Sequence, residues 1–189
     1  MIKDTFQVNE TIKGYYILEK DGKIIAKGHN TIVDKGRQFL FDVFTSNILG
    51  NTSSTYYSEG NKYFLYRLYA GKQLTVNPIT LSNTTWEDIN NEVIQKKNKD
   101  QADENFYREF NSNTLGNTEI TFTEKEICLS LSFTGQSNAQ CISTFFITFT
   151  SGTDNTEKEK NQTLFSRFVI DPIYLVAGST YSLKYYIAF

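Results

Sequence analysis

The stretch TYSLKYYIAF, residues 180–189, decides how the rest of the chain is interpreted. Large apolar side chains alternate in it with smaller or polar ones, and successive side chains of a β-strand point to opposite faces of a sheet. The alternation therefore predicts a half-buried strand that is held in a sheet through its last residue. One face is expected to carry Tyr181, Leu183, Tyr185, Ile187 and Phe189, and the other Ser182, Lys184, Tyr186 and Ala188.

The composition of the chain agrees with a β-rich fold. Aromatic residues make up 15% of the 189 residues, with 15 Phe and 12 Tyr, and there are only two Pro and one Met. Aromatic residues favour strands over helices. A chain of this length buries roughly 70% of the surface that it exposes when unfolded, so a hydrophobic core can stabilise it without metals or disulfides. We therefore expect residues 1–189 to form a single domain.

From residue 105 onward the sequence is typical of a series of strands. Segments such as EICLSLSFTG (126–135), CISTFFITFTSG (141–152) and LFSRFVID (164–171) are separated by clusters of Gly, Asn, Ser and Asp. Short strands with turn residues between them indicate stacked antiparallel sheets. The predicted fold is mainly β, an antiparallel β-sandwich of either the jelly-roll or the immunoglobulin-like kind.

The first half of the chain adds a hairpin and two helices. Asp21-Gly22 separates TIKGYYILEK from KIIAKGH, and an Asp-Gly pair favours a two-residue hairpin turn. Apolar residues at helical spacing predict one main helix near residues 35–49. A short helix is predicted near 85–95, with Thr84 and Glu87 forming its capping box. Polar loop excursions of the domain are expected near residues 51–61, 95–105 and 152–162.

Charge and hydropathy argue against several classes of function. The chain has 19 Lys and Arg against 21 Asp and Glu, a net charge of −2, and no basic block, so no nucleic-acid partner is expected. Apolar runs such as FLFDVF and IYLVAG are too short to span a bilayer. The first residues lack the apolar core of a signal peptide. We expect synthesis in the cytoplasm and no membrane partner.

The two cysteines, Cys128 and Cys141, flank an expected turn near Gly135. They could therefore lie opposite each other on a hairpin and form a disulfide. Two small buried thiols that act as apolar side chains are the favoured alternative, because no export signal is present.

No group of residues in the sequence is typical of a catalytic, cofactor-binding or metal-binding site. The single histidine, His29, follows a predicted strand, and one histidine cannot supply a multi-histidine metal site. No GxSxG, Walker or GxGxxG motif is present. A glycosidase needs only two carboxylates, but those available are expected to be solvated. They are Glu87, Asp88, Glu92, Asp103, Glu104 and Glu109. We therefore expect no enzymatic activity and no cofactor.

Three aromatic residues and three arginines are candidates for binding surfaces. Tyr56, Tyr57 and Trp86 lie among Asn, Ser and Thr, a mixture that suits stacking on sugars or packing against another protein. For Trp86, packing over the core beside its short helix is the favoured alternative. Arginines in strand-like surroundings are expected to pair with acidic groups at strand edges or at subunit contacts. These are Arg67, Arg108 and Arg167.

Several segments form a recognisable series. An Asn-x-Ile-x-x-x-Gly turn leads into an amphipathic helix (NTIVDKGRQFLFDVF, 30–44), and a strand ends in glycine (YRLYAGK, 66–72) before an acidic helix start (WEDINNEV, 86–93). Near the end, CISTFFITFTSG precedes a Leu-x-x-Arg strand, a Pro-Ile corner, a Gly turn and the final alternating strand (164–189). This series, from about residue 14 onward, resembles small structural proteins of tailed bacteriophages.

The resemblance implies a non-enzymatic virion protein, a repeated subunit of a tail, neck ring or capsid-associated assembly. Its partners would be copies of itself in a homo-oligomer and other virion proteins. The alternative is a carbohydrate-binding or adhesin module for host-surface recognition, which requires Tyr56, Tyr57 and Trp86 on one exposed surface. A small hydrolase is a third hypothesis, and it requires two carboxylates that converge in a cleft.

Overall fold

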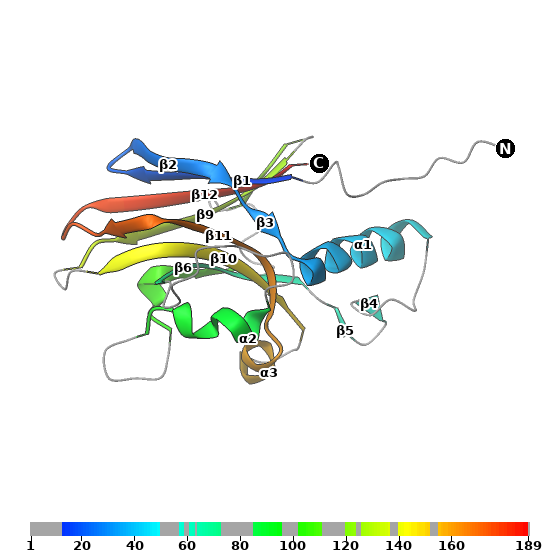
Figure 1. The fold of residues 1–189 in the computed structure, drawn as a ribbon. Helices are drawn as coiled ribbons and strands as arrows, with labels where there is room; N and C mark the ends of the chain where they lie inside the picture. Colours follow the sequence, from blue (N-terminus) through cyan, green and yellow to red (C-terminus); the bar gives the residue numbers. More distant parts are fainter. Residues whose placement is uncertain are drawn as a thin grey trace.

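Two five-stranded antiparallel sheets face each other in the computed structural model, so the predicted β-sandwich is confirmed (Figure 1). The structure describes residues 13–49, 57–58, 61–62, 64–72, 85–95, 102–110, 120–123, 126–136, 140–151 and 155–188. For residues 44–49, 57–58, 61–62, 104, 122 and 155 it describes the backbone course alone.

Each sheet combines strands from distant parts of the chain. Sheet A has the order β2-β1-β12-β9-β8, and sheet B has the order β3-β11-β10-β6-β7. The strands of sheet A are β1 (Lys13–Lys20), β2 (Lys23–His29), β8 (Ile120–Phe122), β9 (Glu126–Thr134) and β12 (Thr180–Ala188). Those of sheet B are β3 (Thr31–Ile32), β6 (Phe64–Gly71), β7 (Tyr107–Glu109), β10 (Cys141–Thr150) and β11 (Thr163–Tyr174).

The remaining elements lie between these strands. A separate small hairpin is formed by β4 (Tyr57–Ser58) and β5 (Asn61–Lys62). The helices are α1 (Asp34–Leu49), α2 (Trp86–Ile89) and α3 (Asn155–Lys160), and the two short 3-10 helices are η1 (Asn90–Glu92) and η2 (Glu104–Phe106).

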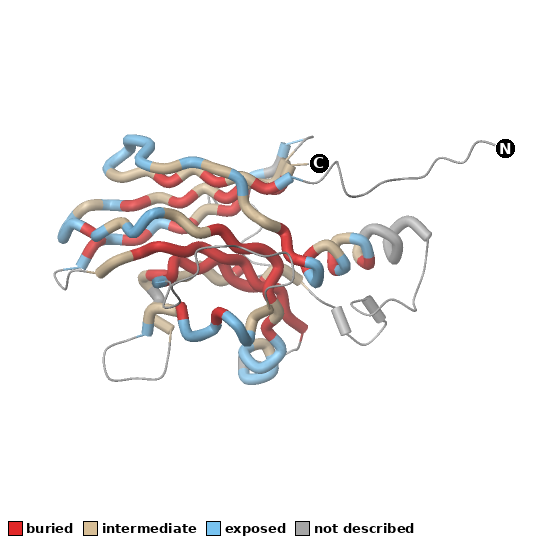
Figure 2. Tube along the Cα trace, viewed as in Figure 1, coloured by how far each residue is buried: buried red, intermediate tan, exposed pale blue. Residues whose placement is uncertain are grey.

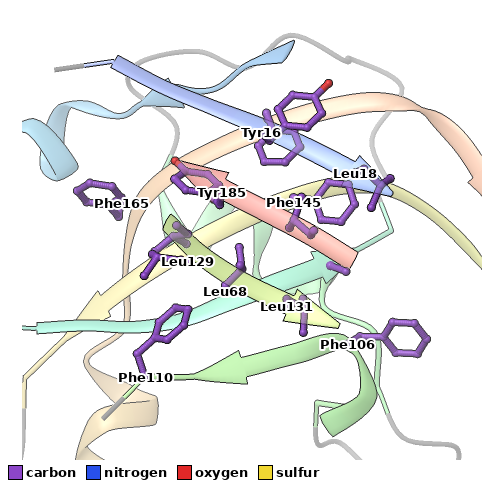
Figure 3. Packing of buried hydrophobic residues seen from close by; sticks show 14 of the residues in the cluster. Tyr16, Leu18, Leu68, Phe106, Phe110, Leu129, Leu131, Phe145, Phe165 and Tyr185 are labelled. Carbon is purple, nitrogen blue, oxygen red and sulfur yellow. The ribbon is translucent and has the colours of Figure 1, made fainter. Parts of the chain in front are cut away.

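The alternation that predicted the last strand is confirmed. In β12 the side chains of Tyr181, Leu183, Tyr185 and Ile187 are all buried, and Phe189 lies outside the described residues. The strand pairs with β1 on one side and with β9 on the other, so it is the central strand of sheet A. Its inward side chains meet those of sheet B in the main core, where Figure 3 shows Tyr185 and Leu129 together with Leu68 and Phe145.

Sheet B is covered on both faces, unlike sheet A. Nine consecutive residues of β10, from Ile142 to Thr150, are buried (Figure 2). Phe145 and Ile147 point into the main core, whereas Phe146 belongs to a second apolar cluster on the opposite face, together with Trp86 and Ile89. The threonines of this strand are buried as well, because Thr148 donates to Gln162 and Thr150 donates to the Lys158 carbonyl oxygen on the side opposite the main core.

The main helix was predicted at residues 35–49 and is found as α1, Asp34–Leu49. It packs against β11, where a Cβ atom at Gly36 would collide with the carbonyl oxygen of Phe165. The Phe39 ring stacks on Phe149, with ring centroids 4.7 Å apart. The predicted hairpin is also confirmed, because Asp21 and Gly22 both have positive φ angles, of 49° and 77°.

The short helix begins one residue later than the sequence analysis predicted. Thr85, not Thr84, is its N-cap, and the Thr85 N–H and hydroxyl both donate to Asp88 Oδ2 at 2.8 Å. This placement makes Trp86 the first helical residue and directs its ring onto Phe146, with centroids 6.0 Å apart. The capping box is therefore formed by Thr85 and Asp88, and the predicted pair of Thr84 and Glu87 is wrong by one residue.

The suggestion that the two cysteines face each other on a hairpin is wrong. Cys128 lies in β9 of sheet A and Cys141 begins β10 of sheet B, so these consecutive strands belong to different sheets. Both thiols are free; Cys128 is buried and Cys141 is half-buried.

Two of the predicted loop excursions contain residues that form regular elements or contacts in the structure. Within 152–162 the structure has α3, and Thr150 Oγ1 donates to the Lys158 carbonyl oxygen at 2.7 Å. Within 95–105, a β-bridge joins Gln95 to Ala102, and Asn105 Nδ2 donates to the Thr134 carbonyl oxygen at 2.9 Å. The 51–61 segment contains β4, with the rest of it largely outside the described residues.

Candidate interaction surfaces

Of the three aromatic residues proposed for sugar binding, Trp86 is the one whose side chain the structure describes. The Trp86 ring lies 5.9 Å from that of Tyr69 and 6.0 Å from that of Phe146, over the second apolar cluster. Trp86 therefore packs over the core beside its short helix, as favoured from the sequence. Tyr56 lies outside the described residues, and for Tyr57 only its backbone, in β4, is described.

One of the candidate carboxylates is buried, contrary to the expectation that all are solvated. The Glu92 side chain is only 1% exposed, and Arg167 Nη2 donates to its Oε1 at 2.6 Å. A pattern in the sequence could have indicated this, because Glu92 follows the buried Ile89 by three residues, on the same face of a helical turn. The sequence analysis missed this residue as a member of the folded interior.

The Glu92–Arg167 pair ties the short-helix segment to sheet B. Arg167 is 4% exposed, and its Nε donates to Thr144 Oγ1 at 3.3 Å. Burial raises the pKa of Glu92, although the positive charge of Arg167 acts in the opposite direction. Because both partners are closed off from solvent, this pair suits a structural clamp and not a binding site.

A second arginine, Arg67 of β6, joins three elements of the outer face of sheet B. Its Nη2 donates to Glu109 of β7 at 2.8 Å, and its Nη1 also forms an ion pair with Glu159 of α3. The guanidinium lies over the ring of Tyr107, 4.4 Å from the centroid. Arg67 and Arg167 therefore pair with acidic groups as predicted, but within the chain. Both carboxylates around Arg67 are bound by one cation.

Hydrogen bonds also join sheet B to Gln162, which follows α3 in the sequence. Tyr69 donates its hydroxyl hydrogen to Gln162 Oε1 at 2.8 Å, and the Thr148 hydroxyl donates to the same oxygen at 3.1 Å. Burial raises the pKa of Tyr69 well above its usual value, so this residue stays neutral. The polar side chains of this face are thus used to fasten α3 to the sheet.

Other sequence candidates do not form a site in the described residues. His29 is exposed at the end of β2. No group of three His, Cys, Asp or Glu side chains able to hold a metal ion occurs among the residues that the structure describes. Within the same residues, no helix has the length and apolar character needed to cross a membrane.

The outer face of sheet A carries aromatic and polar side chains that no described element covers. Tyr15 and Tyr186 stack with their ring centroids 4.4 Å apart, and the Tyr15 hydroxyl donates to Glu126 Oε2 at 2.6 Å. Burial and this hydrogen bond raise the pKa of Tyr15 to about 12. Lys184 Nζ donates to Glu19 Oε1 at 2.9 Å beside them. The side chains of Tyr15, Glu19, Lys184 and Tyr186 are half-buried and held by these contacts, which suits packing against another protein surface.

The four outermost strands of the sandwich differ in length. In sheet B they are β3, of two residues, and β7, of three; in sheet A they are β8, of three residues, and β2, of seven. An unpaired outer strand exposes backbone N–H and C=O groups that can pair with another chain. Ile24 and Ile25 of β2 are 59% and 42% exposed, which adds apolar surface to this edge. Among the described residues, β2 is the long open edge.

Comparison of the chain with protein-family models, with curated proteins and with solved structures gives no significant match.

Proposed function

We propose that this chain is a non-enzymatic virion structural protein of a tailed bacteriophage, a repeated subunit of a tail, neck ring or capsid-associated assembly. Its partners are then copies of the same chain and other virion proteins, and its location is the virion. The residue patterns at 30–44, 66–72, 86–93, 141–152 and 164–189 are the source of the bacteriophage assignment.

The difference between the two sheets is the single observation that most supports an assembly role. Sheet B is covered by its own helices, whereas the outer face of sheet A and the β2 edge lie uncovered among the described residues. A repeated assembly uses one such surface many times, because every copy presents it in the same orientation. The half-buried Tyr15–Tyr186 stack gives that surface a rigid aromatic centre of the kind enriched at protein interfaces.

The state of the acidic side chains supports a non-enzymatic role. Glu92, Glu109 and Glu159 are each bound to an arginine of the same chain. A carboxylate that accepts from an arginine of the same chain is engaged in a contact that holds the fold together. The proposed assembly role requires no chemical reaction, only surfaces that are complementary to those of neighbouring subunits.

The mass of the full chain in solution tests this function. Light scattering coupled to size exclusion should give a multiple of the monomer mass, and negative-stain electron microscopy should show rings or tubes. Ser132→Arg, which places a large cation on the exposed outer face of β9, should reduce that mass without unfolding the chain. Lys35→Glu, an exposed position on α1 away from that face, is the control and should leave the mass unchanged.

A monomer at every concentration, alone and with its co-purifying proteins, would rule out the assembly role. A monomer that binds immobilised glycans would instead support the carbohydrate-binding alternative. No described surface favours that alternative at present, since Trp86 is packed against the core.

A further inference from the structure

The backbone of β2 presents hydrogen-bonding groups along its free side. In the antiparallel β1–β2 ladder, the Asn30 N–H donates to the Gly14 carbonyl oxygen at 3.1 Å. Bonded and non-bonded pairs alternate along such a ladder, so Gly28 is the next residue bonded to β1. The N–H and C=O groups of Lys27 and His29 therefore point away from β1, toward the open edge.

The side chains of β2 indicate what kind of strand this edge would accept. The strand KIIAKGH contains Lys23 and Lys27 and no acidic residue, and Ile24 and Ile25 are largely exposed. Pairing of β2 with the same strand of a second copy is unfavourable. Antiparallel pairing about Ala26 sets Lys23 opposite His29 and places the two copies of Lys27 diagonal to each other, with no acidic side chain between them. The edge suits an extended segment with apolar and acidic side chains.

One segment of this chain outside the described residues has that character. Residues 2–12, IKDTFQVNETI, alternate in the manner of a strand and contain two acidic residues and one lysine. At eleven residues, this segment is longer than the seven residues of β2. The side chains that share one face in this alternation are Ile2, Asp4, Phe6, Val8, Glu10 and Ile12.

The same chain cannot place this segment antiparallel to its own β2. A strand antiparallel to β2 runs parallel to β1, so its last residue would lie beside the Asp21-Gly22 turn. β1 begins at Lys13, at the opposite end of the sheet, roughly 23 Å away for a strand of seven residues. Ile12 and Lys13 are joined by one peptide bond, so antiparallel addition requires a second molecule.

We infer that residues 2–12 of one copy add as an antiparallel strand to the β2 edge of a neighbouring copy, extending sheet A from five strands to six. The inference rests on the proposed function, since it names the contact between repeated subunits. The exchanged strand pairs with the Lys27 and His29 backbone, covers Ile24 and Ile25, and brings Asp4 and Glu10 to an edge that carries lysines.

Two full-length variants test the two sides of this contact. Phe6→Asp/Val8→Asp alters the donated strand and should weaken self-association roughly 100-fold, because two apolar side chains lose their burial. Lys27→Pro alters the accepting edge by removing an outward N–H and should weaken it roughly tenfold, while the β1 pairing is kept. Lys27→Ala is the matched control, since it retains the N–H and should leave the assembly stable.

Mixing the two variants distinguishes exchange between copies from pairing within one copy. The first variant keeps an intact β2 edge and the second keeps an intact donated strand, so a mixture should form a one-to-one pair that neither forms alone. Hydrogen exchange of the β2 amides that point away from β1 should be slow in the unaltered protein and fast in each variant alone. In the mixture it should become slow in the Phe6→Asp/Val8→Asp copy, whose intact edge is then occupied, and stay fast in the Lys27→Pro copy.

Each outcome has a separate meaning. If the unaltered chain assembles and the variants, folded by circular dichroism, assemble equally well, then strand exchange is wrong and the assembly function stands. Slow exchange of β2 in a monomer, without rescue on mixing, would mean pairing within one chain and would also overturn the inference. If the unaltered chain is monomeric with fast exchange at β2, both the inference and the proposed homo-oligomer fail.

Discussion

Replacement of Glu92 by alanine is expected to be among the most destabilising single changes in this protein. The substitution leaves the guanidinium of Arg167 without its ion-pair partner in a position where only 4% of that side chain is exposed. Removing one partner of a buried ion pair costs about 3–5 kcal/mol, because the other charge stays buried and uncompensated. A domain has about 5–15 kcal/mol of stability in total, so Glu92→Ala should remove a large part of it.

Two further variants show whether the cost comes from the buried charge. Glu92→Leu/Arg167→Met replaces the pair by apolar side chains of similar length and should lie within about 2 kcal/mol of the original protein, on either side. Lys184→Ala breaks the Glu19–Lys184 pair on the outer face of sheet A, where the side chains are 20% and 37% exposed. An exposed pair contributes at most about 1 kcal/mol, so this control should change little.

Urea unfolding followed by circular dichroism measures the four proteins on one scale, with the midpoint and slope giving the free energy of unfolding. The reasoning would be refuted if Glu92→Ala lost no more stability than Lys184→Ala. It would equally be refuted if the apolar double variant were as unstable as Glu92→Ala, because the loss would then arise from packing and not from an unpaired charge.

Three more predictions concern packing, pH and capping. Gly36→Ala should cost more than about 2 kcal/mol in urea unfolding, because its Cβ would collide with the Phe165 carbonyl oxygen; a neutral effect would contradict this placement of α1. Burial raises the pKa of Glu92, so the native chain retains a proton that the unfolded chain releases, and stability should fall as pH rises from about 4. The unfolding free energy of the original protein minus that of Glu92→Gln should therefore decrease between acidic and neutral pH, whereas an increase would give the wrong sign. Asp88→Ala removes the acceptor of two Thr85 hydrogen bonds and should cost about 1 kcal/mol of stability, which is seen as a lower melting temperature. An unchanged melting curve would argue against the Thr85 cap.

The elements that could be predicted from sequence are those whose two faces meet different surroundings. β12 has the core on one side and the outer face of sheet A on the other, so burial alternates along it and the sequence alternates too. The helix at Asp34–Leu49 and the Asp21-Gly22 hairpin were predictable for another reason. Residues close together in the sequence determine each of them, through helical spacing in one case and a two-residue turn in the other.

Relations between distant segments could not be read in this way. Glu92 and Arg167 are 75 residues apart, and nothing local to either residue identifies the other as its partner. The sequence of β10 indicates a strand, but it does not say that β10 leaves the sheet of β9, and the hairpin alternative for Cys128 and Cys141 is wrong for that reason. The open edge of β2 is likewise a property of the sheet order and not of the strand itself.

The central position of β12 in sheet A also governs when the protein can fold during translation. Among the described strands, β1 and β9 each pair with β12 and not with each other, so sheet A stays in two pieces until residues 180–188 have left the ribosome. Up to that moment the nascent chain exposes the sides of β1 and β9 that β12 later occupies, and such sides are prone to aggregation. Ribosome stalling or premature termination before residue 180 should therefore yield insoluble chains that depend on chaperones, even though nearly all of the sandwich has been synthesised.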